Sequence, residues 1–340
     1  MRQRDYPRLC PERTGRMLRR AVEQLVDSAI AGTPITQKDA VKLMALPADS
    51  AEASYIAWAA WSLGKEASDN TGQIYAQIGL DATPCPEDCA FCDLGATNAL
   101  GRGRAEVPDD DIVFYARTFD EANVHLISLM ATAAYGFDHF CNVVSKVRDA
   151  VADDMPLMAN IGDVTPEQAA TLKELGIQAF YHANRLGEGE ITRIRPEARL
   201  RTMEAVTNAG LKLMSAVEPV HAQSNPIDIA AHMREVIGLR PYCAGVGALT
   251  VVPGTKMASY QPISRRRARY LAAIMRLIAG RSIPFGCGCG NVVWADAGTN
   301  PRGRNLSTDP DFLKRDVRRL RKELTRDEWS VPARPLSSWM

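Results

Sequence analysis

Three cysteines lie within eight residues of one another, in the segment ATPCPEDCAFCDLG at positions 82 to 95. Since the chain has only eight cysteines, Cys85, Cys89 and Cys92 are a marked concentration of thiols. In an irregular loop, the spacing Cys-x3-Cys-x2-Cys lets three thiolates converge on one metal centre. A tetrahedral zinc site needs a fourth ligand nearby, but the next Cys or His is His125. Three protein ligands on an iron–sulfur cluster instead leave one iron open, which is useful only if something must bind there.

The composition of the chain excludes several other classes of function. Its 340 residues are 46% hydrophobic, and 41 basic against 40 acidic residues give a net charge of +1. Such a balance provides no strong field for nucleic acid or an anionic membrane, so we expect neither partner. The charged N-terminus lacks an apolar signal region and no stretch approaches the roughly 18 apolar residues of a membrane span, so we expect a cytoplasmic protein. In that reducing compartment, clustered cysteines favour metal binding or catalysis over disulfides.

The elements that must position these thiols alternate along the chain. Apolar, β-rich runs recur at about 30-residue spacing. The run at 73–80 leads into the cysteine loop, and helical patterns follow the runs at 124–132, 156–162, 179–184, 211–220 and 244–255. Further strand-like runs lie at 282–290 and 291–298, with no room for a helix of ordinary length between them. The repeats predict an α/β fold with parallel strands and crossover helices, a (β/α) TIM-type barrel that is complete or nearly complete.

Helical segments flank this predicted barrel. We expect an N-terminal helical cap in residues 1–63, the barrel in 64–304, and a C-terminal helix and tail in 305–340, with a basic, solvated surface helix at 309–326. In a parallel barrel, chemistry takes place at the C-terminal ends of the strands and in the loops after them. The three cysteines follow the first predicted strand and therefore fall at that end.

The cysteine segment, with Phe91 directly before its third thiol, resembles the CxxxCxxC signature of radical S-adenosylmethionine enzymes. Residues from about 50 to 290 are similar to the subgroup that contains biotin synthase, the hydrogenase maturase HydE, methylornithine synthase and HmdB. The resemblance implies a [4Fe-4S] cluster on Cys85, Cys89 and Cys92, with S-adenosylmethionine chelated to its open iron. It also implies an electron donor such as flavodoxin or ferredoxin, and a 5'-deoxyadenosyl radical that abstracts hydrogen from a small-molecule substrate.

The same resemblance assigns cofactor contacts. Arg199 in the run RPEARLRTMEAVTNAG matches the arginine that holds the S-adenosylmethionine carboxylate, a task suited to a bidentate guanidinium. Val252 in VVPGT is expected at the adenine, and Phe91 on the cluster side where the nucleoside docks. His182 and Asn184 in YHAN share one strand face by the period-two rule and are expected beside the cofactor. A surface arginine for Arg199 and a core histidine for His182 remain alternatives.

Two departures from the family pattern bear on the reaction. The run ISLMATAAYG lacks the Gly-Gly-Glu that binds the methionine amine in many of these enzymes. The positions at which biotin synthase holds a second, sacrificial cluster fall near Leu129, Met158 and Met214, none of which is a thiol. We therefore do not expect ordinary biotin synthase activity.

A second group of cysteines leaves sulfur insertion as an alternative reaction. Cys287 and Cys289 in FGCGCGN would point to one side of a strand, and we expect them to face the substrate cavity. With Cys10 they could ligate a second iron–sulfur cluster that acts as a sulfur donor. One of these thiols could alternatively donate a hydrogen atom, or the glycines and cysteines could serve close packing only.

Other polar residues complete the candidate site. Glu218 and His221 in VEPVHAQ end the fifth predicted strand, where a barrel places catalytic groups, and we assign both to catalysis. Glu87 and Asp88 of the cysteine loop are expected to be solvated. The leading hypothesis is a HydE-, HmdB- or methylornithine-synthase-like biosynthetic enzyme with one cluster. The alternatives are a sulfur-inserting enzyme with two clusters and a metal-stabilised scaffold without activity.

Overall fold

A nearly closed barrel of eight parallel strands forms the centre of the computed structural model, which describes residues 19–98, 105–298, 309–333 and 335. The strands run in the order β7-β6-β5-β4-β3-β2-β1-β8. Their bounds are β1 (Gln73–Gly79), β2 (Leu126–Met130), β3 (Leu157–Asn160), β4 (Ile177–Tyr181), β5 (Lys212–Val220), β6 (Cys243–Ala248), β7 (Phe285–Gly286) and β8 (Val292–Gly298). The predicted TIM-type barrel is confirmed.

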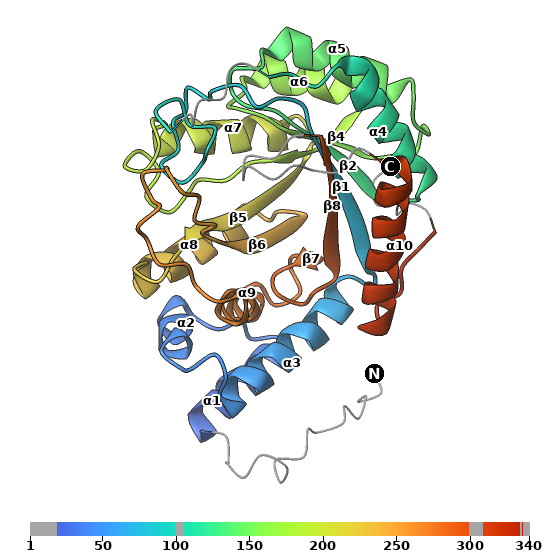
Figure 1. Ribbon diagram of the computed structural model, residues 1–340. Coiled ribbons are helices and arrows are strands. Elements are labelled where there is room, and N and C mark those ends of the chain that lie inside the picture. Colours follow the sequence, from blue (N-terminus) through green and yellow to red (C-terminus); the bar gives the residue numbers. More distant parts are fainter. Residues whose placement is uncertain (1–18, 99–104, 299–308, 334, 336–340) are drawn as a thin grey trace.

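Helices on the outside of the barrel connect consecutive strands (Figure 1). They are α4 (Asp109–Glu121), α5 (Phe137–Arg148), α6 (Pro166–Glu174), α7 (Pro196–Asn208), α8 (Pro226–Gly238) and α9 (Arg265–Ala279). Local sequence fixes where several of them begin. At α6, for example, the Thr165 side chain accepts from the Gln168 amide while the Gln168 side chain accepts from the Thr165 amide. This reciprocal pair satisfies two N–H groups that a helix start otherwise leaves open.

The last strand pair departs from the regular repeat. β7 has two residues and pairs only with the start of β6, Phe285 with Cys243 and Gly286 with Ala244. β8 begins beside the start of β1 and pairs with it along its full length. The residues between β7 and β8 therefore turn at the N-terminal end of the barrel. Gly286 has a φ of 76°, and a Cβ there would collide with the Ala244 carbonyl, so this turn depends on glycine.

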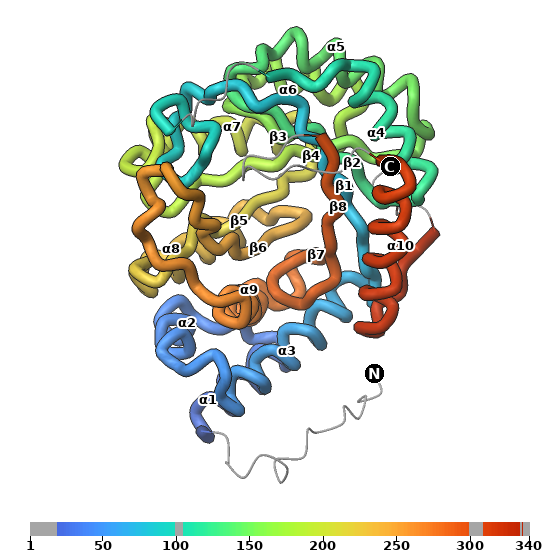
Figure 2. Tube along the Cα trace, in the orientation of Figure 1, coloured from blue at the N-terminus to red at the C-terminus, as the bar shows by residue number. Residues whose placement is uncertain are grey.

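The flanking helices pack against the barrel from two sides (Figure 2). α1 (Arg20–Ile30), α2 (Gln37–Met44) and α3 (Ala51–Ala67) lie against α8 and α9, as expected of an N-terminal helical cap. α10 (Pro310–Arg326) packs on β8 and α4. Its inner face buries Leu313, Val317, Leu320 and Leu324, so the basic helix predicted as a solvated surface helix is solvated on one side only. The domain boundaries after residues 63 and 304 stay predictions.

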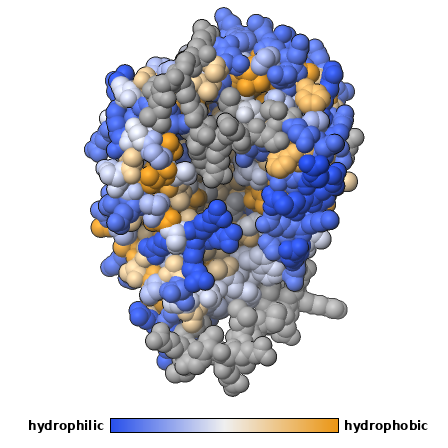
Figure 3. Space-filling view, viewed as in Figure 1, coloured by the Kyte–Doolittle hydropathy of each residue, from blue (hydrophilic) through white to orange (hydrophobic). Residues whose placement is uncertain are grey.

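One face of the molecule is mostly polar. On the face in Figure 3, hydrophilic residues cover most of the visible exterior, with hydrophobic residues scattered between them. Among the described helices, none has the length and apolar character to cross a membrane.

Candidate active site

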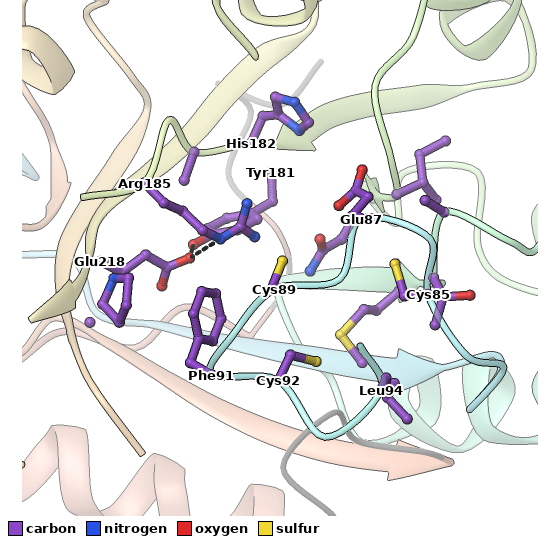
Figure 4. A pocket seen from close by; sticks show the side chains of 18 of the residues that line it. Cys85, Glu87, Cys89, Phe91, Cys92, Leu94, Tyr181, His182, Arg185 and Glu218 are labelled. Carbon is purple, nitrogen blue, oxygen red and sulfur yellow. Dashed lines mark hydrogen bonds and ion pairs between the residues drawn. The ribbon is translucent and has the colours of Figure 1, made fainter. Parts of the chain in front are cut away.

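A cavity of about 520 Å³ opens at the C-terminal ends of the strands. Its inner wall consists of side chains that point into the barrel, among them Gln77, Met158, Asn160, Tyr181, Trp294 and Asp296. Its outer wall comes from the loops that follow the strands, and Cys85, Cys89 and Cys92 line this part together (Figure 4). The three thiols therefore lie where the sequence predicted the chemistry of a parallel barrel.

The cysteine loop is closed on itself by hydrogen bonds. The Cys85 amide donates to the Leu94 carbonyl at 2.6 Å, and the Ala96 amide donates to the Cys85 carbonyl at 3.0 Å. The Asn98 side-chain amide donates to the carbonyls of Cys89 and Cys92, at 2.9 and 3.0 Å. These bonds satisfy backbone groups that no helix or strand would satisfy, and so they hold the loop in one shape.

The thiols need a positive partner before they can act as ligands. Burial raises the pKa of all three, to about 12 for Cys89 and about 11 for Cys92, so they are protonated at neutral pH in the free chain. Bound iron would reverse this, because a coordinating thiol is deprotonated by the metal charge. Within the described residues no three His, Cys, Asp or Glu side chains converge on one ion. Three thiols set apart on one wall fit the separate irons of a cluster.

Asp88 anchors this loop and is the residue that the sequence analysis judged least correctly. Its side chain is 1% exposed and contacts Lys256 and Arg193, each at 3.0 Å. Burial alone would raise its pKa, but hydrogen bonds from Thr97 and Lys256 outweigh burial and hold the pKa at about 2. The expectation of a solvated carboxylate is wrong for Asp88. A charged side chain directly before Cys89 was the only sequence signal available.

Arg199 lies at the cavity and joins three loops. Its guanidinium contacts Glu87 at 2.8 Å, Asp163 at 3.3 Å and Glu188 at 3.5 Å, and the side chain is 2% exposed. Glu87 belongs to the cysteine loop, so its carboxylate is paired rather than solvated as expected. The alternative of a surface arginine is excluded by this burial. The predicted contact between Arg199 and a ligand carboxylate stays a prediction, and the protein's own carboxylates already occupy this guanidinium.

His182 and Asn184 do not act as a pair. β4 ends at Tyr181, so the period-two rule does not reach them, and the prediction that they share one strand face is wrong. His182 lines the cavity and contacts Asp163 at 2.7 Å, with a pKa lowered by burial. The Asn184 side chain instead donates to Glu235 on α8 at 2.8 Å and is not part of the cavity wall. Of the two, only His182 lines the cavity.

Tyr181, Arg185 and Glu218 form a polar group on the wall opposite the cysteines (Figure 4). The Tyr181 hydroxyl donates to Glu218 Oε1 at 2.9 Å, and Arg185 Nε lies 3.9 Å from the same oxygen. The Arg185 guanidinium lies over the Phe91 ring, 5.7 Å from its centroid. Sequence reasoning found Glu218 from its place at the end of a strand, but missed Arg185 because a loop arginine carries no pattern.

Of the remaining predicted site residues, two line the cavity and one does not. Phe91 and Val252 both line the cavity, where the resemblance expected a nucleoside. His221 does not line it, and its ring packs edge-on against Tyr260 with centroids 4.8 Å apart. The expectation of His221 beside the substrate therefore does not hold in the part of the chain that the structure describes.

Cys287 and Cys289 lie at the opposite end of the barrel from the cavity. They occupy the turn between β7 and β8 and are buried, 0% and 5% exposed, and Cys289 packs against Gly64 of α3. Cys287 has a φ of 49°, so the alternation of a strand does not apply to it. The prediction that both thiols face the substrate cavity is wrong. Cys10, the third thiol assigned to a second cluster, lies outside the described residues.

Barrel and site fit one class of protein: enzymes that hold a metal cluster on cysteines that follow the first strand of a parallel barrel. No family model matches the chain. The biotin synthase of Cenarchaeum symbiosum (strain A) is 24% identical over 268 residues, which cover 76% of this chain and 81% of the relative. The solved methylornithine synthase (PylB) has a TM-score of 0.74 at 15% identity and covers 92% of this chain and 97% of its own.

HydG, a maturase of the [FeFe]-hydrogenase, is a further structural neighbour. It has a TM-score of 0.65 at 14% identity over 79% of this chain, which spans 63% of the HydG chain. These structural similarities show the shared fold, and the sequence similarity to the biotin synthase extends over 76% of this chain. The chain belongs to the radical S-adenosylmethionine superfamily, in the subgroup related to biotin synthase and methylornithine synthase. The predicted resemblance is confirmed at this level.

Proposed function

We propose that this enzyme uses the cavity to cleave S-adenosylmethionine reductively and to abstract hydrogen from a small metabolite or cofactor precursor. The observation that carries the proposal is the placement of Cys85, Cys89 and Cys92 together on the wall of the cavity at the C-terminal mouth of the barrel. When bound there, a [4Fe-4S] cluster supplies the electron for cleavage of the sulfonium and hence the 5'-deoxyadenosyl radical. An electron donor such as flavodoxin or ferredoxin belongs to the proposal.

The chain's own residues have separate tasks in this scheme. The three cysteines bind the cluster, and Asp88 fixes the loop that carries them through its contacts with Lys256 and Arg193. Phe91 and Val252 flank the space beside the cluster and exclude water from it. Glu218, held by Tyr181, presents a carboxylate to the substrate side of the cavity. The reaction accordingly takes place inside the barrel mouth, where a radical is shielded from solvent.

Sulfur insertion has no comparable support. The turn that carries Cys287 and Cys289 lies at the other end of the barrel, so a cluster there would not meet a substrate in the cavity. Met158, near which the resemblance to biotin synthase places a thiol, lines the cavity and offers none. We therefore propose a reaction at carbon that uses one cluster.

Iron content tests the proposal directly. We expect anaerobically purified and reconstituted wild-type protein to hold about four irons per chain, and to release 5'-deoxyadenosine from S-adenosylmethionine after reduction. A Cys89→Ala, Cys92→Ala double variant should lose both, because two of three ligands are gone. Cys141→Ala is the matched control, since that thiol lies on α5 outside the cavity wall.

A second variant separates the alternatives. A Cys287→Ala, Cys289→Ala protein should keep the full iron content and the full yield of 5'-deoxyadenosine. If the wild type held about eight irons and this variant about four, a second cluster would be present and the one-cluster proposal would be wrong.

A further inference from the structure

Arg185 carries hydrogen-bond donors that the described residues leave unused. Its guanidinium points into the cavity between Glu218 and the cysteine loop (Figure 4), and its side chain is 18% exposed. The ionic contacts to Glu188 at 3.7 Å and to Glu218 at 3.9 Å are too long for hydrogen bonds. Within the described residues, its buried Nε has no hydrogen-bond partner. A guanidinium has five N–H donors, and burying them without acceptors is costly unless a ligand supplies them.

Neighbouring cations of the site have acceptors for their terminal nitrogens. Arg199 Nε also lacks a hydrogen-bond partner among the described residues, but its Nη2 donates to Glu87 at 2.8 Å and its Nη1 to Asp163 at 3.3 Å, so protein carboxylates take up the fork of this guanidinium. Arg193 pairs with Asp88 at 3.0 Å, and its side chain is 60% exposed to water. An anionic group that enters the cavity therefore finds Arg199 occupied and Arg185 available.

Glu218 is held too far from Arg185 to accept a hydrogen bond from its guanidinium. The Tyr181 hydroxyl holds its Oε1 at 2.9 Å, and Glu218 packs so closely on Gly247 that a Cβ there would lie 2.7 Å from Oε2. The position of the Glu218 carboxylate is thus set by the Tyr181 hydroxyl and by packing on Gly247. The planar fork of a guanidinium matches a carboxylate bidentately. A doubly charged phosphate fits less well, because the carboxylates of Glu188 and Glu218 lie within 3.7 and 3.9 Å of the guanidinium and repel the phosphate.

We propose that Arg185 binds a carboxylate group of a ligand in this cavity. The carboxylate belongs either to S-adenosylmethionine or to the second molecule that reacts with it, and in this respect the inference rests on the proposed function. Arg185 is then a binding residue that also determines which substrates enter, because neutral analogues leave its donors unpaired.

Binding measurements on the iron-loaded protein test the first source. The affinities of S-adenosylmethionine and of its decarboxylated analogue are measured by equilibrium dialysis for wild type, Arg185→Gln, Arg185→Lys and the control Arg201→Gln, an exposed position on α7. If the carboxylate is that of S-adenosylmethionine, Arg185→Gln weakens its binding at least ~30-fold, because a buried charge pair loses one partner. Arg185→Gln binds the decarboxylated analogue with the same affinity as wild type. The control Arg201→Gln binds both compounds with wild-type affinity.

A second arm tests the other source. In protein saturated with S-adenosylmethionine, ¹³C-labelled acetate is titrated and followed by NMR, with acetamide as the neutral probe. If the second molecule carries the carboxylate, wild type binds acetate but not acetamide, and Arg185→Gln loses acetate binding while its affinity for S-adenosylmethionine is unchanged.

The proposal is overturned if Arg185→Gln matches wild type with both S-adenosylmethionine and acetate. Arg185→Lys keeps the positive charge but not the planar guanidinium, so it should lose less affinity for the same ligand than Arg185→Gln does. If Arg185→Gln fails to take up iron, the comparison is made with Arg185→Lys instead. Failure of the proposed function is a different result, since wild type would then bind neither iron nor S-adenosylmethionine.

Discussion

His125 is a fully buried histidine that joins the barrel to the C-terminal tail. Its Nδ1 accepts from the Ile74 amide at 2.8 Å, and its Nε2 donates to the Pro332 carbonyl at 2.9 Å. Burial lowers its pKa from 6.5 to about 4, although the Pro332 carbonyl favours the charged form. The neutral ring satisfies one donor and one acceptor at once, and protonation would set an N–H against the Ile74 N–H.

This lowered pKa predicts a dependence of stability on pH. Since the folded-state pKa is below the unfolded value, His125 contributes stability that is fully present above pH 6.5 and is lost as the pH falls toward about 4. For His125→Gln, urea unfolding should show a pH dependence between pH 7 and 4 that is smaller than that of wild type by about 3 kcal/mol. His221→Gln, at a half-exposed ring, is the control and should follow wild type. Parallel pH curves for wild type and His125→Gln would contradict this role.

Residue types with a fixed spacing were predictable, whereas charge networks were not. The three thiols and Phe91 were identified from one short segment, residues 85–92. The partners of Asp88 and Arg199 lie about 100 residues or more away in several cases, as for Lys256 with Asp88 and Glu87 with Arg199. Such pairs arise only when the barrel brings separate loops to one end, and the sequence of each loop does not encode its partner.

Among the elements, α3 makes an unusually close contact with the turn that follows β7. Gly64 lies in the helix, and a Cβ at this position would approach Cys289 Sγ within 2.6 Å and also collide with its Cβ. Glycine weakens a helix interior by roughly 1 kcal/mol relative to alanine, so its presence here reflects close packing. The thiol of Cys289 fills the space that the absent side chain leaves.

Two alanine substitutions should therefore have opposite effects. Gly64→Ala should lower the free energy of unfolding by about 1–3 kcal/mol, because overpacking outweighs the gain in helix propensity. Gly238→Ala in α8 is the matched control, since a Cβ there meets nothing within 4 Å. It should be neutral or stabilise by up to ~1 kcal/mol. Both are measured by urea unfolding, and a stabilised Gly64→Ala protein would refute the close contact.

Element types were predicted more reliably than element ends. All six regular strands were found from their periodicity, with helices after five of them, but α4 was not predicted. The runs predicted as strands at 179–184 and 282–290 are too long, because β4 ends at Tyr181 and β7 at Gly286. Both errors moved predicted site residues to the wrong place. Beyond Gly286, positive φ angles at Cys287, Gly288 and Gly290 turn the chain back, a conformation that an apolar Gly/Cys run does not reveal.

At the scale of the whole molecule, the barrel has a seam between β7 and β8. Within the described residues β8 pairs with β1 alone, and β6 has β7 as a partner for two residues only. Hydrogen bonding around the barrel is therefore interrupted over most of the strand length at this point. The seam borders the cavity, to which β8 contributes Trp294 and Asp296.

Hydrogen exchange should reveal this seam. The amides of β8 that point away from β1, and those on the open edge of β6, should exchange faster than the amides of β1, which is paired on both sides. Exchange resolved by NMR in the iron-free protein provides the measurement, with β1 as the internal reference. Equal protection of β1 and β8 would mean that the barrel is closed at this point.

The tethered cysteine loop has a consequence for the order of assembly. Asp88 and Arg199 hold the loop through contacts with other protein side chains, and their own side chains are 1% and 2% exposed. The conformational entropy of the loop is therefore lost when the barrel folds, not when iron arrives. A zinc finger, by contrast, remains unfolded until its metal binds. Here the folded barrel is the template, so insertion of the cluster becomes a late step that acts on a finished protein.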